Sequence, residues 1–283
     1  MDLKLRYLVS EAVKAYLDAE KKTLDEFSDE TKISKVTLYH LLETNEASPK
    51  TIEAVYSFLY RFGYRINAVK EEFLKETSKD KLLFHGSKAG LESIISLGAR
   101  KNCDFGNGFY LGETYAQALA FVCENESSSV YSFSFADRGL KTLKYDVSLD
   151  WMLSICHYRG FLRRFDESKH LSGLVRRVAA ADLIIAPIAD NRMFYIMSLF
   201  ANGDINSNVA LHSLSASRLG LQYIFKTDKA LKCLQPIERY YLCEEEREDA
   251  RAVLNKRAAE IDTKLKLAKR EFRDGLFVEE LLK

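Results

Sequence analysis

The chain has 283 residues, of which 47% are hydrophobic and 12% aromatic, so it can build two packed domains or one domain with appendages. Its 42 Lys and Arg nearly balance 41 Asp and Glu, and a net charge of +1 excludes binding to nucleic acid or anionic lipid through overall charge alone. Five cysteines without a C-x-x-C pair argue against a disulfide framework or a zinc ribbon, and no run reaches the ~18 apolar residues of a membrane span. We therefore expect a cytoplasmic protein that binds neither metal nor membrane.

The first 70 residues have the pattern of a helical bundle. Apolar residues recur at three- and four-residue spacing between Leu5 and Leu17, as on one buried face of a helix. Each of three further helices is preceded by a capping residue; these are Thr23, which with Glu26 forms a capping box, Ser34, and Ser48, which Pro49 follows. Gly63 is well placed to end the last of these helices. The pattern predicts a compact all-α domain over residues 1–70.

Within this bundle, the run Ile33-Ser34-Lys35-Val36-Thr37-Leu38 resembles the helix-turn-helix of the lambda-repressor/Xre class, over roughly residues 8–66. In that class the helix that begins near Ser34 enters the major groove of DNA. Its exposed residues here would be Lys35, Thr37, Tyr39 and His40. Affinity for DNA depends on phosphate neutralisation, and acidic residues flank this helix. A bundle used for dimerisation or for docking a partner protein is therefore an equal alternative.

A nearly fully charged segment at 71–81 predicts the domain boundary, either as an exposed helix end or as a short linker. Leu82-Leu83-Phe84 then predicts a short buried strand that ends in His85-Gly86-Ser87, with a helix following over residues 90–97. At Gly86 the backbone can approach a planar ligand closely, because no side chain intervenes. His85 and Ser87 have no evident acid partner, so we do not expect a hydrolase triad.

The next segment, residues 104–111, is a glycine-punctuated loop that runs into an aromatic strand, and a helix is predicted over residues 114–122. The pair His85-Gly86-Ser87 and Phe105-Gly106-Asn107-Gly108-Phe109-Tyr110 resembles the ADP-ribosyltransferase fold of the diphtheria-toxin and poly(ADP-ribose) polymerase branch. It most resembles a bacterial family known only as a domain of unknown function. The resemblance spans roughly residues 82–242. The alternative is a plain hairpin with Tyr110 in the core.

This resemblance implies that NAD is the substrate. The side chain of His85 would bond the adenosine ribose, the backbone of Gly86 the nicotinamide amide, and Tyr110 would stack on the nicotinamide ring. In that branch a second aromatic residue from the following helix sandwiches the ring, and Tyr115 or Phe121 can serve here. The other residues expected to bind NAD are Ser87, Phe105 and Gly108.

The third motif of the branch is a glutamate on a later strand, which stabilises the oxocarbenium-like transition state. The matching strand is predicted over residues 219–225, and the matching position holds Gln222. Glutamine can orient a ribose hydroxyl, but it supplies no negative charge and no base at pH 7, a loss worth about 2–4 kcal/mol of barrier. Asp190 and Glu238 are the carboxylates that can substitute, although Asp190 also fits the N-cap of the helix predicted over 192–200.

Two further segments are distinctive. Basic side chains predominate between His157 and Arg177; they either line a cleft for the NAD pyrophosphate or a nucleic-acid acceptor, or form a solvated helix face. Residues 244–283 predict one long charged helix with a narrow apolar stripe, which would pack along the domain or mediate self-association. The stripe residues are Val253, Ala258, Ile261, Leu265 and Leu267.

We therefore predict an α+β protein. It would contain a helix-turn-helix bundle (1–70), a charged linker (71–81), a split-sheet ADP-ribosyltransferase-like domain (82–243) and a terminal helix (244–283). The resemblance implies an NAD-dependent mono-ADP-ribosyltransferase that modifies a protein or nucleic acid. Joined to a repressor-like module, it is typical of a bacterial toxin-antitoxin or phage-defence toxin with an antitoxin partner. The alternatives are a catalytically silent NAD- or ADP-ribose-binding module, marked by Gln222, and a transcriptional regulator that senses a nucleotide.

Overall fold

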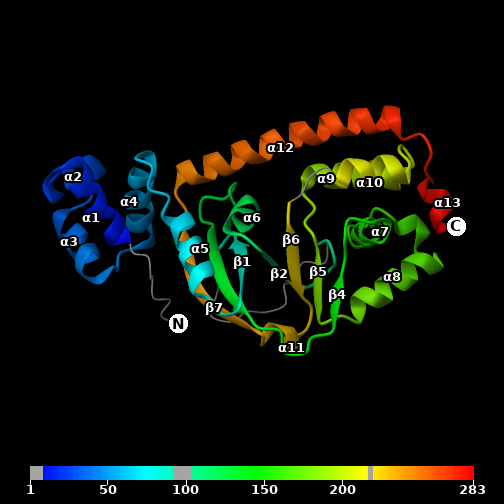
Figure 1. The fold of residues 1–283 in the computed structure, drawn as a ribbon, viewed down its shortest axis with the longest axis horizontal. Coiled ribbons are helices and arrows are strands. Elements are labelled where there is room, and N and C mark those ends of the chain that lie inside the picture. The colour runs from blue at the N-terminus through cyan, green and yellow to red at the C-terminus, as the bar shows by residue number, and fades with distance from the viewer. Residues whose placement is uncertain (1–8, 92–102, 216–218) are drawn as a thin grey trace. The chain divides into compact units, whose positions relative to one another are not determined.

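The computed structural model describes residues 9–91, 103–215 and 219–283. The protein is a mixed α and β structure, with a series of N-terminal helices and a mixed sheet of seven strands among the described residues (Figure 1). It divides into two compact units. The first comprises residues 1–93, 114–135 and 235–252, and the second comprises residues 94–113, 136–234 and 253–283. The predicted residues Leu5 and Leu8 of the first helix, and most of the helix expected over 90–97, lie outside the described residues.

The first unit begins with helices α1 (Val9–Glu20), α2 (Leu24–Thr31), α3 (Lys35–Thr44), α4 (Pro49–Arg61) and α5 (Ile66–Thr77). The predicted N-caps are confirmed. The hydroxyl of Thr23 accepts a hydrogen bond from the backbone N–H of Glu26 in a full capping box, and Ser34 and Ser48 cap α3 and α4 in the same way. The helices bury an apolar core that includes Tyr16, Phe27, Leu38, Val55 and Leu59.

The segment expected as a charged linker is largely helical, because residues 71–77 continue α5. The reason is that α5 has an inner side despite its charges: Lys70 and Leu74 are buried. The division of the chain into four segments along the sequence stays a prediction.

The strands of the first unit are β1 (Lys81–Ser87), β3 (Ser129–Phe135) and β7 (Leu234–Tyr241), in the order β1-β3-β7. Strand β1 is longer than predicted. His85, Gly86 and Ser87 do not follow the strand but belong to it, because they pair antiparallel with Tyr131, Val130 and Ser129. Helix α6 (Tyr115–Ala120) packs on β1 and β3 and begins at the N-cap Thr114.

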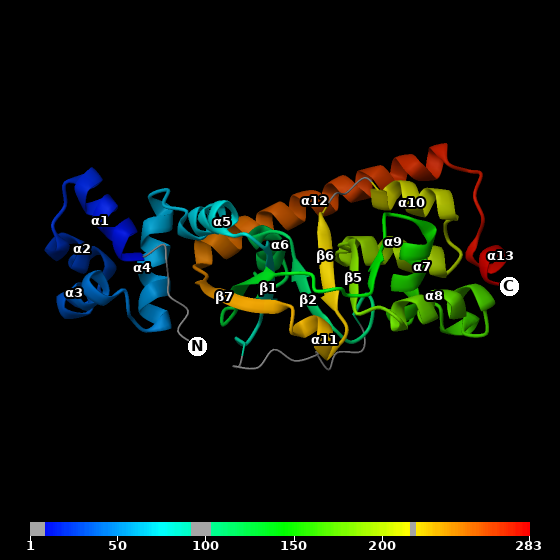
Figure 2. The same cartoon turned by 60° about the horizontal axis from the view of Figure 1, so that its bottom comes forward.

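In the second unit, strands β4 (Thr142–Lys144), β5 (Leu183–Pro187), β6 (Leu221–Phe225) and β2 (Phe109–Gly112) follow one another in the order β4-β5-β6-β2. Helices α7 (Leu149–Tyr158), α8 (Lys169–Ala179), α9 (Asn191–Ala201) and α10 (Ser207–Ser215) gather on the side of β5 away from β6 (Figure 2). The short helices η1 (Arg163–Phe165) and α11 (Asp228–Leu231) complete the unit. Its core includes Trp151, Ile155, Ile184, Phe200 and Ile224, all fully buried.

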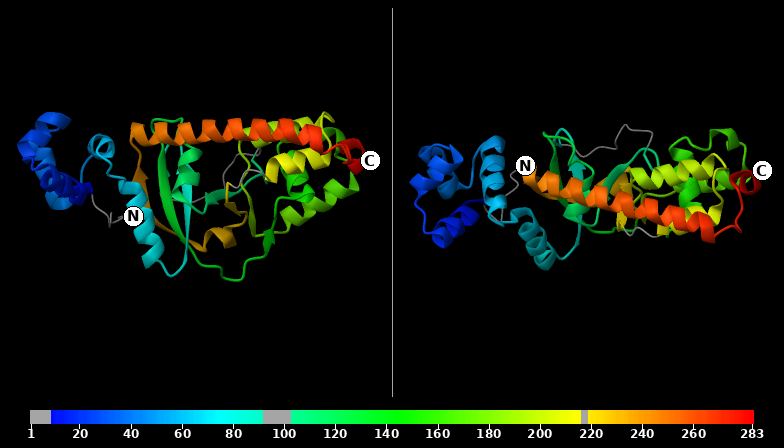
Figure 3. Two further views of the ribbon diagram at one scale, coloured as in Figure 1. Left: turned by 45° about the horizontal axis from the view of Figure 1, so that its top comes forward. Right: turned by 90° about the horizontal axis from the view of Figure 1, so that it is seen from above.

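The terminal segment is not the single helix that the sequence predicted. Helix α12 (Glu244–Glu271) is one unbroken helix in Figure 3, but α13 (Val278–Leu282) is separate from it. The Asn206 side chain explains the break, since its Nδ2 donates to the carbonyls of Phe272 and Arg273 and thereby satisfies the end of α12. Of the predicted stripe, Ile261 and Leu265 are buried, whereas Val253 and Leu267 are exposed.

Among the helices that the structure describes, none combines the length and the apolar composition needed to cross a membrane.

Candidate functional site

The first unit holds one half of the residues expected to bind NAD, on strand β1. Successive residues of a strand point to opposite faces, so Phe84 and Gly86 share one face and His85 lies on the other. Helix α6 covers the face of Gly86: a Cβ atom there would clash with the Ala118 carbonyl and lie 2.9 Å from Val122 Cγ1. His85 and Ser87 are half-buried, and Ser87 Oγ donates to the Gly90 carbonyl at 2.7 Å.

The two aromatic residues proposed to sandwich the nicotinamide differ sharply in exposure. Tyr115 is buried, and its hydroxyl donates to Glu246 Oε2 at 2.9 Å and accepts from Asn67 Nδ2 at 2.8 Å. Phe121, just after α6, is 58% exposed. Of the two, Phe121 is the aromatic side chain open to a ligand.

The second unit holds the glycine-punctuated loop, which is packed tightly. A Cβ atom on Gly108 would lie 2.7 Å from Ile224 Cγ2, and Gly106 has a positive φ of 73° beside the ring of Tyr158. Phe105 is fully buried and stacks on Tyr145, with ring centroids 5.4 Å apart. Both glycines are therefore required by the fold of the loop itself.

Lys226 fixes this loop from the end of β6. Its Nζ donates to the carbonyl oxygens of Phe105 and Asn107. Burial lowers the pKa of the Lys226 amine. The hydrogen bonds hold the backbone of the loop next to strand β6 of the same unit.

Tyr110 and Gln222 are brought together by the sheet. In the antiparallel pair β2–β6, Tyr110 lies opposite Ile224 and Gly112 opposite Gln222, so these side chains share one face. The ring of Tyr110 is half-buried. Its hydroxyl donates to the Gly106 carbonyl at 2.7 Å and accepts from the Phe105 N–H at 3.1 Å, and burial raises its pKa. Tyr110 thus holds the glycine loop with its hydroxyl while its ring lies on the face of Gln222.

A buried carboxylate that the sequence did not single out stands beside Gln222. Gln222 is 4% exposed, and its Nε2 donates to Asp104 Oδ2 at 2.9 Å and to the Pro187 carbonyl at 3.1 Å. The other carboxylate oxygen, Asp104 Oδ1, accepts from Arg159 Nη2 at 2.7 Å and Nε at 3.0 Å. Burial raises the pKa of Asp104, and the Arg159 guanidinium acts in the opposite direction.

The two carboxylates proposed as substitutes for the glutamate have other partners. Asp190 is the N-cap of α9, where its Oδ1 accepts from the Met193 N–H at 2.9 Å. Glu238 is buried in the first unit, where its Oε1 is 2.8 Å from Lys70 Nζ. Asp104 is thus the carboxylate that the structure places next to Gln222. No pattern in a single sequence links Asp104 to Gln222. The available signal is that a carboxylate between Cys103 and Phe105 needs a polar partner if it is buried.

A second buried polar cluster lies in the first unit and was not predicted. Glu246 accepts hydrogen bonds from the hydroxyls of Tyr56 and Tyr115, each at 2.9 Å, and from Asn67 Nδ2 at 3.0 Å. Burial raises the pKa of Glu246 to about 7. This cluster joins α4, α5, α6 and α12 within the unit.

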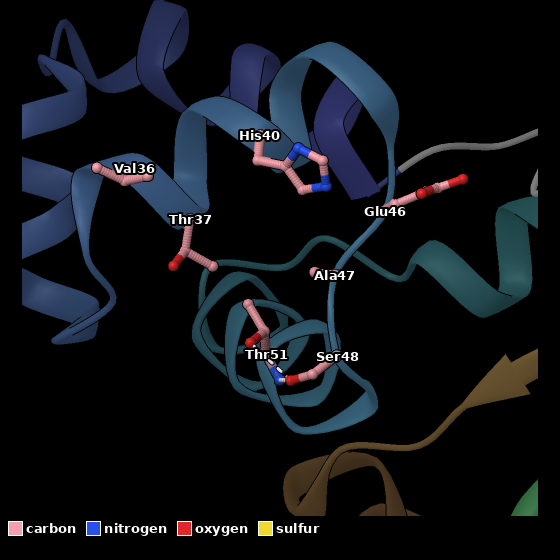
Figure 4. A pocket seen from close by; sticks show the side chains of 7 residues that line it. All are labelled: Val36, Thr37, His40, Glu46, Ala47, Ser48 and Thr51. Carbon is pink, nitrogen blue, oxygen red and sulfur yellow. Dashed lines mark hydrogen bonds between the residues drawn. The ribbon is translucent and has the colours of Figure 1, made fainter.

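The residues proposed for DNA contact lie on α3. Tyr39 and His40 are exposed, but Lys35 Nζ lies 2.6 Å from Asp25 Oδ2, and the Thr37 hydroxyl bonds Ser34 Oγ. A hollow of about 650 Å³ lies between α3 and the start of α4 (Figure 4). It is lined by Val36, Thr37, His40, Glu46, Ala47, Ser48 and Thr51.

The basic stretch of the second unit is engaged mainly in separate contacts. Arg177 and His170 both lie next to Asp150, at 2.9 and 3.4 Å, and Arg164 lies 2.6 Å from Glu279. The apolar residues Trp151 and Ile155, which precede this stretch on α7, are fully buried. The same stretch also borders a hollow of about 440 Å³, so the cleft and the helix face both stay predictions. This hollow is lined by His157, Asp166, Leu171, Ser172, Val175 and Arg176. Nor does the described part of the chain bring together three His, Cys, Asp or Glu side chains as metal ligands.

A comparison with models of protein families finds a match to the C-terminal part of the chain. A family described as "Protein of unknown function (DUF3990)" matches residues 82–235, just over half of the chain. The matched segment contains His85, Gly86, the glycine loop, Tyr110 and Gln222. A comparison with curated proteins and another with solved structures each found no match.

Proposed function

The chain belongs to the DUF3990 family, whose description assigns no activity, and we propose that it is an NAD-dependent mono-ADP-ribosyltransferase. The residues matched by the family include both motifs that resemble the ADP-ribosyltransferase fold, His85-Gly86-Ser87 and Phe105–Tyr110. One observation carries the proposal: Tyr110 and Gln222, far apart in the sequence, lie on one face of the β2–β6 pair.

In this proposal the side chains named by the resemblance bind NAD, and the reaction is a substitution at the ribose. The bond between nicotinamide and the ribose C1′ breaks, nicotinamide leaves with the bonding electrons, and positive charge develops on the ribose. A nucleophile of the acceptor then forms the new bond to C1′ and releases its proton to solvent. Gln222 can accept a hydrogen bond from a ribose hydroxyl, and Tyr110 can offer its ring to the nicotinamide.

The proposed reaction is transfer of single ADP-ribose units. Gln222 brings no charge to the developing cation, and the neighbouring carboxylate of Asp104 is already paired with Arg159. A preorganised charge opposite the cation is usually worth about 10²–10³ in rate, so a slow enzyme is expected. As a toxin of a toxin-antitoxin or phage-defence system, such an enzyme would modify a protein or nucleic acid and be restrained by an antitoxin; this assignment rests on analogy.

A catalytically silent NAD- or ADP-ribose-binding module is the second candidate, and it is favoured because the Gln222 side chain is neutral and both N–H groups of its amide are hydrogen-bonded within the protein. Two measurements with the full chain and a cell lysate distinguish the transferase from the silent module. They are the release of nicotinamide and the transfer of label from labelled NAD. We expect both signals, and we expect His85→Ala to abolish them. His212, exposed on α10, provides the matched control His212→Ala. NAD binding without nicotinamide release or label would instead support the silent module.

We assign helices α2 and α3 to a helix-turn-helix in the same proposal. Lys32 between them adopts a left-handed conformation with φ 59°, and α3 exposes Val36 by 80% and Tyr39 by 54%. The ion pair of Lys35 with Asp25 reduces the charge available to phosphate. A gel-shift titration at several salt concentrations tests DNA binding, which Tyr39→Ala should weaken. If no complex with DNA forms that depends on salt concentration and on DNA sequence, the result would argue for a protein-docking role.

A further inference from the structure

The amide of Gln222 has an orientation that its neighbours dictate. Its terminal nitrogen lies 3.1 Å from the Pro187 carbonyl oxygen and 2.9 Å from Asp104 Oδ2. A backbone carbonyl can only accept a hydrogen bond, and an ionised carboxylate can only accept as well. The atom between them must therefore be the NH2 group, since an amide oxygen there would face two acceptors.

Both N–H groups of Gln222 are consequently used, one by each acceptor. This leaves the carbonyl oxygen Oε1 as the part of the side chain that can meet a ligand. Among the described residues, no side chain donates a hydrogen bond to Oε1. At this position the side chain is therefore an acceptor and not a donor.

Asp104 can hold one N–H group of Gln222 because the two oxygens of its carboxylate have separate partners. Arg159 donates with two nitrogens to Oδ1 alone, at 2.7 and 3.0 Å, which leaves Oδ2 to Gln222. Arg159 in turn lies over the ring of Phe194, with 3.8 Å between its guanidinium carbon and the ring centroid. The order of contacts is Phe194, Arg159, Asp104 and Gln222, all within the second unit.

We propose that Asp104 is the positioning residue of the nucleotide site: with the Pro187 carbonyl it fixes the amide of Gln222 so that Oε1 accepts a hydrogen bond from a ribose hydroxyl. The inference rests on the proposed function, because it takes NAD as the ligand. It adds that the site distinguishes a ribose from a deoxyribose. It also explains why glutamine stands here, since a second carboxylate at this position would face both Asp104 and the Pro187 carbonyl.

Binding measurements test this assignment without requiring turnover. The full chain is titrated with NAD and with an NAD analogue that lacks the 2′-hydroxyl of the nicotinamide ribose. One hydrogen bond corresponds to roughly a tenfold difference in affinity, so the unaltered chain should bind NAD about tenfold more tightly than the analogue. Asp104→Asn and Gln222→Leu should reduce this ratio to about one. Asp182→Asn is the matched control, because Asp182 is paired with Lys229 and makes no contact with Gln222; it should keep the ratio.

Thermal unfolding gives a second measurement that is independent of NAD. Gln222→Glu should lower the melting temperature increasingly as the pH rises, because it adds a carboxylate beside Asp104. Asp104→Asn in the same chain should recover part of that loss, since it removes the like charge and supplies a donor. If Gln222→Glu lowers the melting temperature equally with Asp or with Asn at position 104, the side chains at 104 and 222 are not coupled.

The possible outcomes separate this inference from the function on which it rests. Absence of NAD binding by the unaltered chain would overturn both. NAD binding with no preference for the 2′-hydroxyl, or with a preference that survives Asp104→Asn, would overturn the inference and leave the proposed function standing.

Discussion

Raising the pH from 5 to 8 is expected to destabilise the protein through one side chain, Glu246. This carboxyl is 6% exposed and is enclosed by Tyr56 of α4, Asn67 of α5 and Tyr115 of α6, with Arg247 next to it in α12. Three hydrogen bonds favour its ionised form, but burial outweighs them and raises the pKa from 4.5 to about 7. The protonated carboxyl is therefore the form that suits the folded protein.

The direction and size of the effect follow from linkage. Between pH 4.5 and 7 the folded chain holds a proton that the unfolded chain releases, so the free energy of unfolding falls as the pH rises through this window. One pKa unit corresponds to about 1.4 kcal/mol, which gives a loss of about 2.5 kcal/mol from this group between pH 5 and pH 8. The loss is complete slightly above the folded pKa.

Urea unfolding of the full chain at several pH values between 5 and 8 measures this contribution. Other groups also titrate, so the quantity to compare is the difference between the unaltered chain and Glu246→Gln, whose amide does not titrate. Glu248→Gln, at an exposed position of the same helix, is the matched control and should keep the original profile. A Glu246→Gln variant with the same pH dependence as the unaltered chain would refute the assignment to Glu246.

Two further predictions concern packing and a buried charge. Gly86→Ala should lower the free energy of unfolding by about 1–3 kcal/mol, because its methyl group would clash with the Ala118 carbonyl of α6. In the same urea titration the control Gly173→Ala, where nothing lies within 4 Å of the added methyl group, should be neutral or stabilising by up to about 1 kcal/mol. Equal effects of the two substitutions would contradict the packing at Gly86. Lys70→Met should lower the free energy of unfolding by about 3–5 kcal/mol, because it removes the ion-pair partner of the buried Glu238. Adding Glu238→Leu should recover most of this stability. Additive losses of stability in the double variant would show that the pair is not coupled.

The helix boundaries that could be predicted depend on residues close together in the sequence. Thr23, Ser34, Ser48 and Asp190 each cap a helix through a backbone N–H only three positions ahead, so their signal is local. The break after α12 could not be predicted in this way. It depends on Asn206, whose partners Phe272 and Arg273 lie more than sixty residues along the chain.

The polar clusters show the same limit more clearly. Glu246 meets Tyr56, Asn67 and Tyr115, and Asp104 meets Gln222 118 positions away. Each partner is an ordinary residue of its own helix, strand or loop, and only the fold brings them together. Burial of a charge can be suspected from apolar neighbours in the sequence, but the identity of its partner cannot.

Gly86 and Gly108 show why the evidence for function depends on polar side chains. The sequence suggests that Gly86 lets a ligand approach the backbone and that Gly108 binds NAD, yet in the structure α6 takes the space of a Cβ atom on Gly86, and Ile224 takes that space at Gly108. Tight packing alone would preserve both residues in a protein that binds no nucleotide. It would not require the Gln222 amide to use both N–H groups and leave its oxygen as the acceptor. The choice between an NAD site and a structural motif therefore depends on Gln222 and Asp104, whose contacts the glycines do not explain.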